Sequence, residues 1–288
     1  MKPNSIFFSR KLKDRLPHVA REIESKLRDN NITPKWLDMT YDIWARDYMP
    51  LQVDKDVFLH YYYYPDYLLK TLEDRASITN PIRLEQAILM ANGKHVESLP
   101  LILDGGNVVM TDKNVILTDK VLEENKRISK DAVQEVVETM LREAFKSEPI
   151  LVKWEKSTEP FGHIDWLVRY IGGKDNLIIV GFNEKSTMAT AEDAYKKLCE
   201  AAHYRVEKFQ LTNPNEKKSW AYLNYVQVEN VILMPTVADK GNDEEAINLL
   251  QNFYDEAGMD VKIEAIDCQD LIELGGALHC ISWNPYLD

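Results

Sequence analysis

The chain has 288 residues, of which 45% are hydrophobic and 28% are charged, and its formal net charge is −12 at pH 7. This composition supports a buried core and excludes a disordered chain. The acidic balance argues against a protein that binds nucleic acid through a basic face. Because the sequence has neither a signal-peptide core nor an apolar run of about 18 residues, it predicts a cytoplasmic globular protein without a membrane partner. We expect one domain, residues 1–288.

The cysteine content favours the same compartment. The three cysteines, Cys199, Cys268 and Cys280, are odd in number and widely spaced, and they form no CxxC pair. A disulfide framework is therefore not expected, and a reducing environment is the default. Cys199 and Cys268 are interpreted as structural.

Five amphipathic helical patterns recur along the chain, and a short strand-like segment follows each one. In chain order the pairs are Leu16–Arg28 with Thr33–Leu37, Ile82–Ala91 with His95–Leu99, Asp131–Phe145 with Ile150–Trp154, Ala191–Ala202 with Tyr204–Phe209, and Glu244–Tyr254 with Val261–Ile266. An irregular stretch follows each strand, and then two β-rich runs that predict a hairpin. The irregular stretches recur about every 57 residues, which indicates a repeat architecture.

Two hairpins are clearest, and the last unit is incomplete. Val108–Thr111 pairs with Val115–Thr118 across a turn, and Tyr222–Val228 pairs with Val231–Pro235. The fifth unit lacks its second hairpin strand, which the N-terminal Ile6–Ser9 can supply so that no edge strand stays open. The sequence predicts an α/β fold, a five-bladed propeller of pseudo-symmetric strand–strand–helix–strand units. The alternative is an ordinary α/β sandwich.

Polar residues mark the junctions between these units. The irregular stretches hold Asp47, Asp104, the pair His163 and Asp165, the stretch Asn213–Trp220, and the segment Gly275–Cys280. In a ring of equivalent units, equivalent junctions converge on the axis, where a pocket is expected.

The last of these junctions carries a candidate nucleophile. Two glycines precede a short predicted β run, on which Cys280 shares a face with Leu278 and Ser282. Since side chains alternate along a strand, we expect His279 to point away from Cys280. The alternative is a buried structural cysteine.

His163 and Asp165 lie two residues apart, on one face of a predicted extended run. A carboxylate beside an imidazole raises the imidazole pKa, and an imidazolium favours a nearby thiolate, the nucleophilic form of cysteine. One alternative is a structural His–Asp pair. Another is a zinc site formed with Cys280, but a tetrahedral zinc centre matches this residue set poorly.

Asp47 and Asp104 bring the number of carboxylates to three. Each one alone is typical of a turn or cap. Three desolvated carboxylates together require a cation, and a planar guanidinium offers five N–H donors that match carboxylates. The constellation predicts a guanidinium pocket with a thiol beside it.

With these motifs the sequence resembles the agmatine deiminase and bacterial-type peptidyl-arginine deiminase family, within the guanidino-modifying superfamily that has the pentein fold. The matching motifs are WARD (Trp44–Asp47), DGGN (Asp104–Asn107), GHID (Gly162–Asp165), YLNYVQVENVILMP (Tyr222–Pro235) and GGALHC (Gly275–Cys280). They occur in the family's order and at about its spacing.

The resemblance implies a role for each matching residue. Cys280 corresponds to the nucleophile and His163 to the general acid and base. Asp47 and Asp165 correspond to the carboxylates that hold the guanidinium. Asp104 stands where the family usually has the glutamate that orients the histidine.

Other positions leave the substrate open. Leu274 and Ala277 replace a glycine and an asparagine that agmatine enzymes usually carry. An α-carboxylate on the substrate would need a cation, for which Arg46 and Arg169 are candidates. Trp44 is assigned to the substrate pocket, and Trp166 and Trp283 are further candidates for its wall.

The resemblance implies a hydrolytic deiminase of a small, agmatine-like guanidino compound, in arginine or polyamine metabolism. Cys280 would form a covalent thiouronium intermediate, and neither a metal nor an organic cofactor would be required. The alternatives are a deiminase of free or peptidyl arginine, an amidinotransferase, and a catalytically silent binding module of the same fold. A homodimer is the default oligomer.

Overall fold

The computed structural model describes residues 2–126, 133–157 and 161–288, and these ranges contain five three-stranded sheets. In each sheet the middle strand is antiparallel to one neighbour and parallel to the other. In hydrogen-bonded order the sheets are β15 (Ser282–Trp283), β1 (Phe7–Ser9) and β2 (Lys35–Leu37); β3 (Leu51–Asp54), β4 (Val57–Tyr62) and β5 (His95–Ile102); β6 (Val109–Met110), β7 (Asn114–Thr118) and β8 (Glu148–Val152); β9 (Val168–Gly172), β10 (Leu177–Gly181) and β11 (Arg205–Phe209); and β12 (Val226–Val228), β13 (Val231–Thr236) and β14 (Lys262–Asp267).

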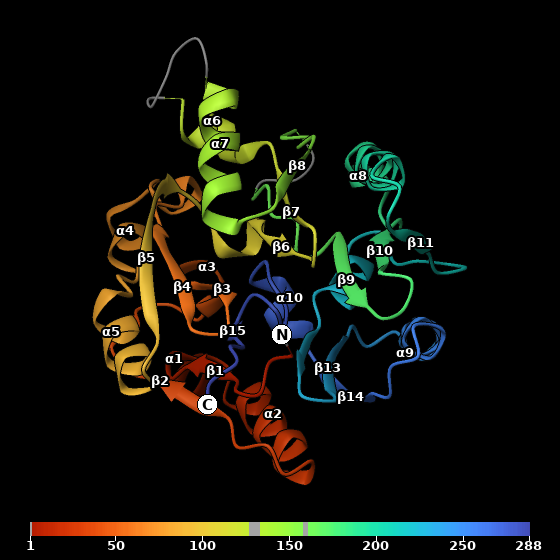
Figure 1. Cartoon of the computed structure of the whole chain (residues 1–288). Coiled ribbons are helices and arrows are strands. Elements are labelled where there is room, and N and C mark those ends of the chain that lie inside the picture. The colour runs from red at the N-terminus through yellow and green to blue at the C-terminus, as the bar shows by residue number, and fades with distance from the viewer. Residues whose placement is uncertain (1, 127–132, 158–160) are drawn as a thin grey trace.

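Helices connect the second and third strands of each unit, and Figure 1 shows the longer ones on the outside of the ring of sheets. The α-helices are α1 (Lys11–Arg15), α2 (Pro17–Asp29), α3 (Ala45–Tyr48), α4 (Leu72–Ala76), α5 (Ile82–Ala91), α6 (Lys120–Glu124), α7 (Val133–Phe145), α8 (Met188–Glu200), α9 (Lys240–Glu256) and α10 (Gln269–Glu273). Short 3-10 helices span Asp66–Leu68, Gly105–Asn107, Lys185–Thr187 and Ser219–Leu223.

The helix α2 illustrates why these segments fold as they do. Pro17 stands in its first turn, where the missing N–H costs no hydrogen bond. Its buried residues, Val19, Ala20, Ile23 and Leu27, recur at helical spacing and form one apolar face. Packing of this face against the rest of the protein stabilises the helix more than local propensity does.

The middle strands form the most buried part of each unit. All five residues of β7 are buried, and so are residues 231–235 of β13 and 177–180 of β10. A strand covered on both faces requires a continuous apolar run, as a partly parallel sheet within an α/β fold does. The sequence of each middle strand therefore sets its central place.

Pairing between the two ends of the chain closes the ring. Phe7 of β1 lies opposite Trp283 of β15 in antiparallel register, and β1 runs parallel to β2. The prediction that an N-terminal strand completes the fifth unit is confirmed. The five-bladed arrangement is also confirmed, and the α/β sandwich alternative is wrong.

Two predicted strands differ from the structure. The segment Tyr222–Val228 is a strand only from Val226, because the 3-10 helix Ser219–Leu223 occupies its beginning. The segment before β15 is a turn, in which the N–H of Ser282 donates to the carbonyl of His279 at 3.1 Å. In both places the backbone serves the central site, as described below. The first two residues of the predicted helix Asp131–Phe145 lie outside the described residues.

Within the described ranges, no helix combines the length and the apolar character needed to cross a membrane.

Candidate active site

Hydrogen bonds join the unit junctions directly to one another at the centre of the ring. The N–H of Arg46 donates to the carbonyl of Cys280 at 3.0 Å, and the N–H of Gly106 donates to Oδ1 of Asp47 at 3.0 Å. The N–H of Asp165 donates to the carbonyl of Gly106 at 3.1 Å. The structure therefore brings four junctions into contact, and the predicted site residues lie together.

The glycine at position 106 permits this close approach. A Cβ atom on Gly106 would lie 2.6 Å from Oδ1 of Asp47 and 2.7 Å from Nδ1 of His163. Neither atom is the tip of a long, flexible side chain that could move aside. A larger residue at position 106 would therefore push apart the aspartate and the imidazole. The DGGN motif thus keeps these two groups adjacent.

His163 contacts two of the predicted carboxylates. Its Nε2 lies 3.2 Å from Oδ2 of Asp104, and its Nδ1 lies 3.7 Å from Oδ1 of Asp47. Burial lowers the pKa of His163, but the charge of Asp47 and the hydrogen bond with Asp104 outweigh it and raise that pKa to about 9. The shorter side chain of Asp104 therefore still reaches the imidazole directly.

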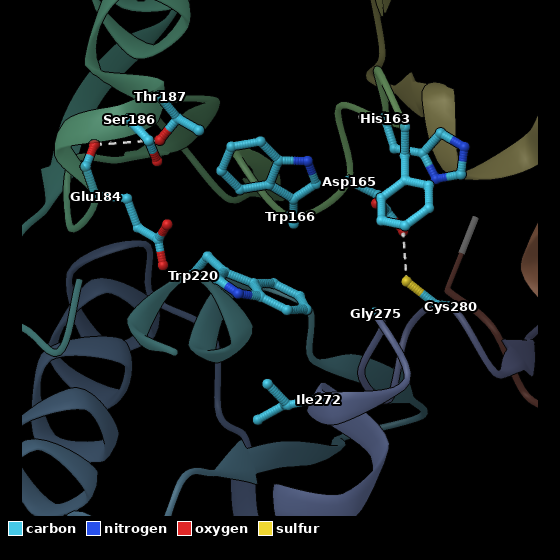
Figure 2. Close-up of a pocket in the computed structure, with 11 residues that line it drawn as sticks. His163, Asp165, Trp166, Glu184, Ser186, Thr187, Trp220, Ile272, Gly275 and Cys280 are labelled. Carbon is cyan, nitrogen blue, oxygen red and sulfur yellow. Dashed lines mark hydrogen bonds between the residues drawn. The ribbon is translucent and has the colours of Figure 1, made fainter. Parts of the chain in front are cut away.

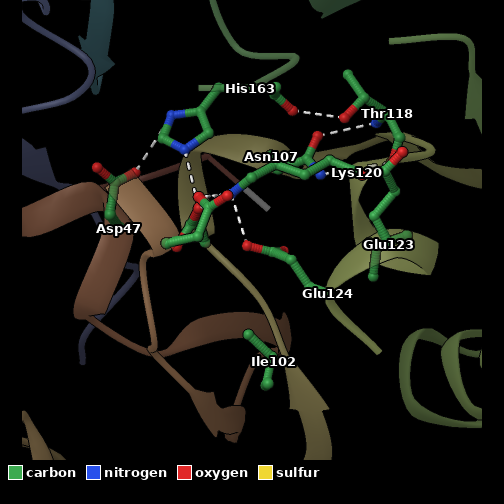
Figure 3. A network of polar contacts seen from close by, with 12 residues as sticks. Asp47, Ile102, Asn107, Thr118, Lys120, Glu123, Glu124 and His163 are labelled. Atoms are coloured by element: carbon green, nitrogen blue, oxygen red, sulfur yellow. Dashed lines mark hydrogen bonds and ion pairs between the residues drawn. The ribbon is translucent and has the colours of Figure 1, made fainter. Parts of the chain in front are cut away.

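Lys120 holds Asp104 from the other side, and sequence reasoning did not identify it. Its Nζ lies 2.5 Å from Oδ2 of Asp104 and 2.7 Å from Oε1 of Glu124, and all three side chains are buried. Figure 3 shows the contact between Lys120 and Glu124. Burial raises the pKa of Asp104, but Lys120 and then His163 lower it to about 2. Asp104 is thus an anion fixed between two cations.

A usable signal for Lys120 existed in the sequence. Lys120 and Glu124 are four residues apart on α6, which directly follows the buried strand β7. A lysine at the start of a helix that emerges from a buried strand has few routes to solvent. Its partner Asp104 is 16 residues away, however, and only the fold shows that pairing.

Asp165 forms a separate cluster with His279 and Cys280. Its Oδ2 lies 2.5 Å from Nδ1 of His279 and 4.0 Å from Sγ of Cys280. An ionised carboxylate only accepts, so Nδ1 of His279 is the donor. Burial, followed by the charges of Arg46 and Arg169, lowers the pKa of His279 to about 3, and the ring is neutral.

One prediction about these residues is wrong. His279 does not point away from Cys280, because residues 278–281 form a turn and the strand alternation does not apply. The hydrogen-bond partner of Asp165 could not be predicted from the GHID motif. Asp165 bonds to His279, which is 114 residues away.

The backbone of Cys280 is held by two other junctions. Its N–H donates to Oδ1 of Asn224 at 3.2 Å, and its carbonyl accepts from Arg46. Asn224 follows the 3-10 helix that replaces the predicted strand, so this irregular backbone positions the candidate nucleophile.

The thiol of Cys280 lies in an anionic environment. Burial raises its pKa well above the usual value, and the charges of Asp165 and Asp47 raise it further. In the free protein Cys280 is therefore a thiol, and the prediction that the imidazolium keeps it as a thiolate is wrong for this state.

Two cavities open next to Cys280. The larger, of about 260 Å³, appears in Figure 2 and is lined by Phe161, His163, Asp165, Trp166, Glu184, Ser186, Thr187, Trp220, Ile272, Gly275 and Cys280. The smaller, of about 110 Å³, is lined by Trp44, Asp47, Tyr67, Leu68, Phe161, His163, Leu274, Gly275 and Cys280. Cys280 and His163 are among the residues that line both cavities.

Some candidates lie elsewhere. Trp283 packs against Phe7 in the core and donates its indole N–H to the carbonyl of Pro50. Arg46 is bonded to Asn284, and Arg169 stacks over Tyr225 at 4.2 Å from the ring centroid. Neither arginine lines the two cavities beside Cys280.

Among the residues that the structure describes, no group of three or more His, Cys, Asp or Glu side chains is arranged to hold a metal ion. The zinc alternative built on His163, Asp165 and Cys280 therefore lacks a suitable ligand set.

A family model for Porphyromonas-type peptidyl-arginine deiminases matches residues 16–285. No protein of curated function matches the sequence.

Several solved structures share the fold at low sequence identity. An agmatine deiminase of Enterococcus faecalis is 16% identical with a TM-score of 0.70, over 99% of this chain and 94% of that one. An agmatine deiminase of C. jejuni is 17% identical with a TM-score of 0.69, over 100% and 94%. DDAH from Pseudomonas aeruginosa is 14% identical with a TM-score of 0.58, over 99% and 100%.

Proposed function

The chain belongs to the Porphyromonas-type peptidyl-arginine deiminase family, and from this premise we propose that it is a hydrolytic deiminase of a small guanidino compound. In this proposal Cys280 is the nucleophile, His163 is the general acid and base, and Asp47 and Asp165 bind the guanidinium. Asp104 positions His163, and Trp44 lines the pocket.

One observation carries the proposal most directly. Among the described residues, Oδ1 of Asp165 is buried without a hydrogen-bond partner, while its Oδ2 lies 4.0 Å from the sulfur of Cys280. A buried carboxylate oxygen without a donor is costly unless a ligand supplies one. A guanidinium supplies two parallel N–H groups to a carboxylate, and its central carbon would then lie near the sulfur.

A second carboxylate also favours a cationic ligand. Burial, opposed by the charge of His163, raises the pKa of Asp47 to about 7, with smaller upward contributions from Asp104 and Asp165. A bound guanidinium would stabilise the ionised form of Asp47 as well as that of Asp165. The same positive charge would offset the two carboxylates that raise the pKa of the Cys280 thiol, and so would promote thiolate formation beside the reacting carbon.

The reaction then follows from the groups present. When the guanidinium binds, the thiol of Cys280 releases its proton to water. The resulting thiolate attacks the central carbon and forms a C–S bond, and a C–N bond breaks as ammonia leaves with a proton from His163. His163, now neutral, accepts a proton from water as that water attacks the thiouronium carbon. The C–S bond breaks, and a ureido product and the thiol are released.

Relatives support this assignment of the cysteine. A C. jejuni agmatine deiminase with a cysteine-to-serine change holds bound substrate, and P. aeruginosa DDAH with a cysteine-to-serine change holds citrulline, a ureido compound. We transfer to Cys280 the role that these variants suggest for their own cysteines.

A substrate panel tests the proposal. Agmatine, arginine, methylated arginines and arginyl peptides are incubated with the protein, and ureido product and free ammonia are measured. We expect both products in equal amounts from at least one small guanidine. If the amidino group instead appears on an added acceptor amine, and neither ureido product nor ammonia forms, the protein is an amidinotransferase. If correctly folded protein converts no member of the panel, the proposal is wrong.

A further inference from the structure

The larger cavity extends well beyond the guanidinium position proposed above. From Cys280 and Asp165 it passes between apolar walls formed by Trp166, Trp220 and Ile272 (Figure 2). Such walls suit an aliphatic linker, which contributes binding energy through burial and carries no polar group.

Glu184 lies at the other end of these walls. It directly precedes the 3-10 helix Lys185–Thr187, and its side chain points toward the cavity and Trp220 in Figure 2. Among the described residues its Oε1 is buried and has no hydrogen-bond partner. Burial, opposed by hydrogen bonds from Trp220 and Ser186, raises the pKa of this carboxyl to about 7. Within the described part of the chain, Glu184 therefore has a free acceptor and no counter-ion.

Among the residues that the structure describes, no lysine or arginine forms an ion pair with this carboxylate. The described residues that line the cavity include neither lysine nor arginine. The adjacent Lys185 is mostly exposed, and its Nζ lies 2.5 Å from Oε1 of Glu216. Arg46 and Arg169, the candidates for binding an α-carboxylate, are engaged outside the cavity. This end of the pocket suits a donor or a cation and opposes an anion.

We propose that Glu184 forms a second subsite, which binds a positively charged group at the far end of the substrate. This inference rests on the proposed function. The substrate class is then a guanidine joined by an apolar linker to an amine. An α-amino acid such as arginine would place its carboxylate near Glu184, where like charges repel. A simple alkylguanidine would fill the linker region but leave Glu184 unpaired.

Two guanidines of equal linker length test the subsite, namely agmatine and butylguanidine. They share the reacting group and the four-carbon chain, and only agmatine carries the terminal ammonium. For the wild-type protein we expect a higher kcat/KM with agmatine. In Glu184→Gln the ratio of the two kcat/KM values should fall by roughly tenfold to hundredfold, the effect of losing a hydrogen-bonded charge.

Glu216→Gln is the matched control. It removes the same charge from a residue that is close enough for its charge to act on Glu184, but that pairs with Lys185 and does not line the cavity. Its substrate ratio should equal that of the wild type. Thermal unfolding checks that each variant is folded.

A charge reversal gives a second, independent variant. In Glu184→Lys the preference should shift toward arginine, whose α-carboxylate can now pair with the new ammonium.

Binding to Cys280→Ala protein, measured by calorimetry with the same two guanidines, separates the possible failures. Equal ratios in wild type and Glu184→Gln, or equal affinities for both guanidines, would overturn the subsite and leave the deiminase proposal intact. If neither guanidine yields ureido product in the wild type, the deiminase proposal fails. Tighter binding of agmatine that Glu184→Gln abolishes would still support the subsite in that case.

Discussion

Two clusters of side chains at the centre of the ring differ in how their buried charges are compensated. In one, the Asp104 wall (Asp104, Lys120, Glu124 and His163), each carboxylate has a cation of the protein beside it. In the other, the Asp165 wall (Asp165, His279 and Cys280), the contacting imidazole is neutral and the sulfur is a thiol.

From this difference we infer separate functions for the two walls. A preorganised ion network holds an imidazole in one orientation and does not need a ligand to be stable. Asp104, Glu124 and Asp165 each have a buried oxygen without a hydrogen-bond partner. Of these three described carboxylates, only Asp165 has no lysine or protonated imidazole in contact with it, so its free oxygen can accept from a bound cation. We therefore interpret the Asp104 wall as support for His163 and the Asp165 wall as the surface that receives the substrate.

The largest effect is expected at the sulfur. Cys280→Ala should reduce ureido formation by roughly 10⁴-fold or more, as removal of a nucleophile does. The ammonia assay measures it, and Cys199→Ser is the control because Cys199 is exposed and lies on α8. If the alanine variant retained turnover, the Asp165 wall would not take part in the reaction.

Asp165→Asn should lower kcat/KM by roughly 10²- to 10³-fold, since it removes the anion that holds the guanidinium. The free energy of unfolding should fall. Burial raises the pKa of Asp165, but the hydrogen bond from His279 and the charges of His163 and Arg169 outweigh it and lower that pKa, so the ionised carboxylate stabilises the fold. Steady-state kinetics and denaturant unfolding measure the two quantities. An unchanged kcat/KM in folded Asp165→Asn protein would show that this carboxylate does not hold the guanidinium.

Lys120→Met should act mainly on the free energy of unfolding. Removing the cation leaves Asp104 and Glu124 buried without it, which destabilises a protein by roughly 3 kcal/mol. Lys94→Met is the matched control, because Lys94 is equally buried but pairs with carboxylates that are half-exposed. Its cost should be about 1 kcal/mol or less.

If Lys120 had only a structural role, its removal would not change the pKa of His163. Lys120 lowers the pKa of His163 by its charge, so that pKa should rise in Lys120→Met and remain unchanged in Lys94→Met. An NMR titration of His163 distinguishes these outcomes.

The smallest effect concerns pH. The pKa of His163 is raised from 6.5 to about 9 in the folded protein. Protonation therefore stabilises the fold fully below pH 6.5, and this stabilisation is lost as the pH rises through 9. Denaturant unfolding at pH 6 and pH 9 should show a loss of roughly 1–3 kcal/mol that His163→Gln lacks. An equal loss in the variant would assign the effect to other groups.

The ring of five units and the convergence of its junctions could be predicted from the sequence. Each middle strand is mostly apolar, and each junction carries proline, glycine, aspartate or asparagine, so the repeat can be recognised locally. The N-terminal strand could be placed because the fifth unit lacked one strand.

The charge pairing could not be predicted in the same way. Asp165 bonds to His279 across 114 residues and Asp104 to Lys120 across 16, and no spacing rule connects those positions. Strand alternation predicts the wrong orientation for His279, because residues 278–281 form a turn. Hydrogen bonds from this segment to Asn224 hold the turn.

Acid-quenched mass spectrometry of the protein during turnover of agmatine is the strongest test of Cys280 as the nucleophile. We expect a peptide containing Cys280 whose mass increases by that of the substrate minus one ammonia, with more of this adduct in His163→Gln because hydrolysis is slowed. Ureido product formed while the Cys280 peptide stays unmodified in both proteins, or an adduct on another residue, would contradict this role of Cys280.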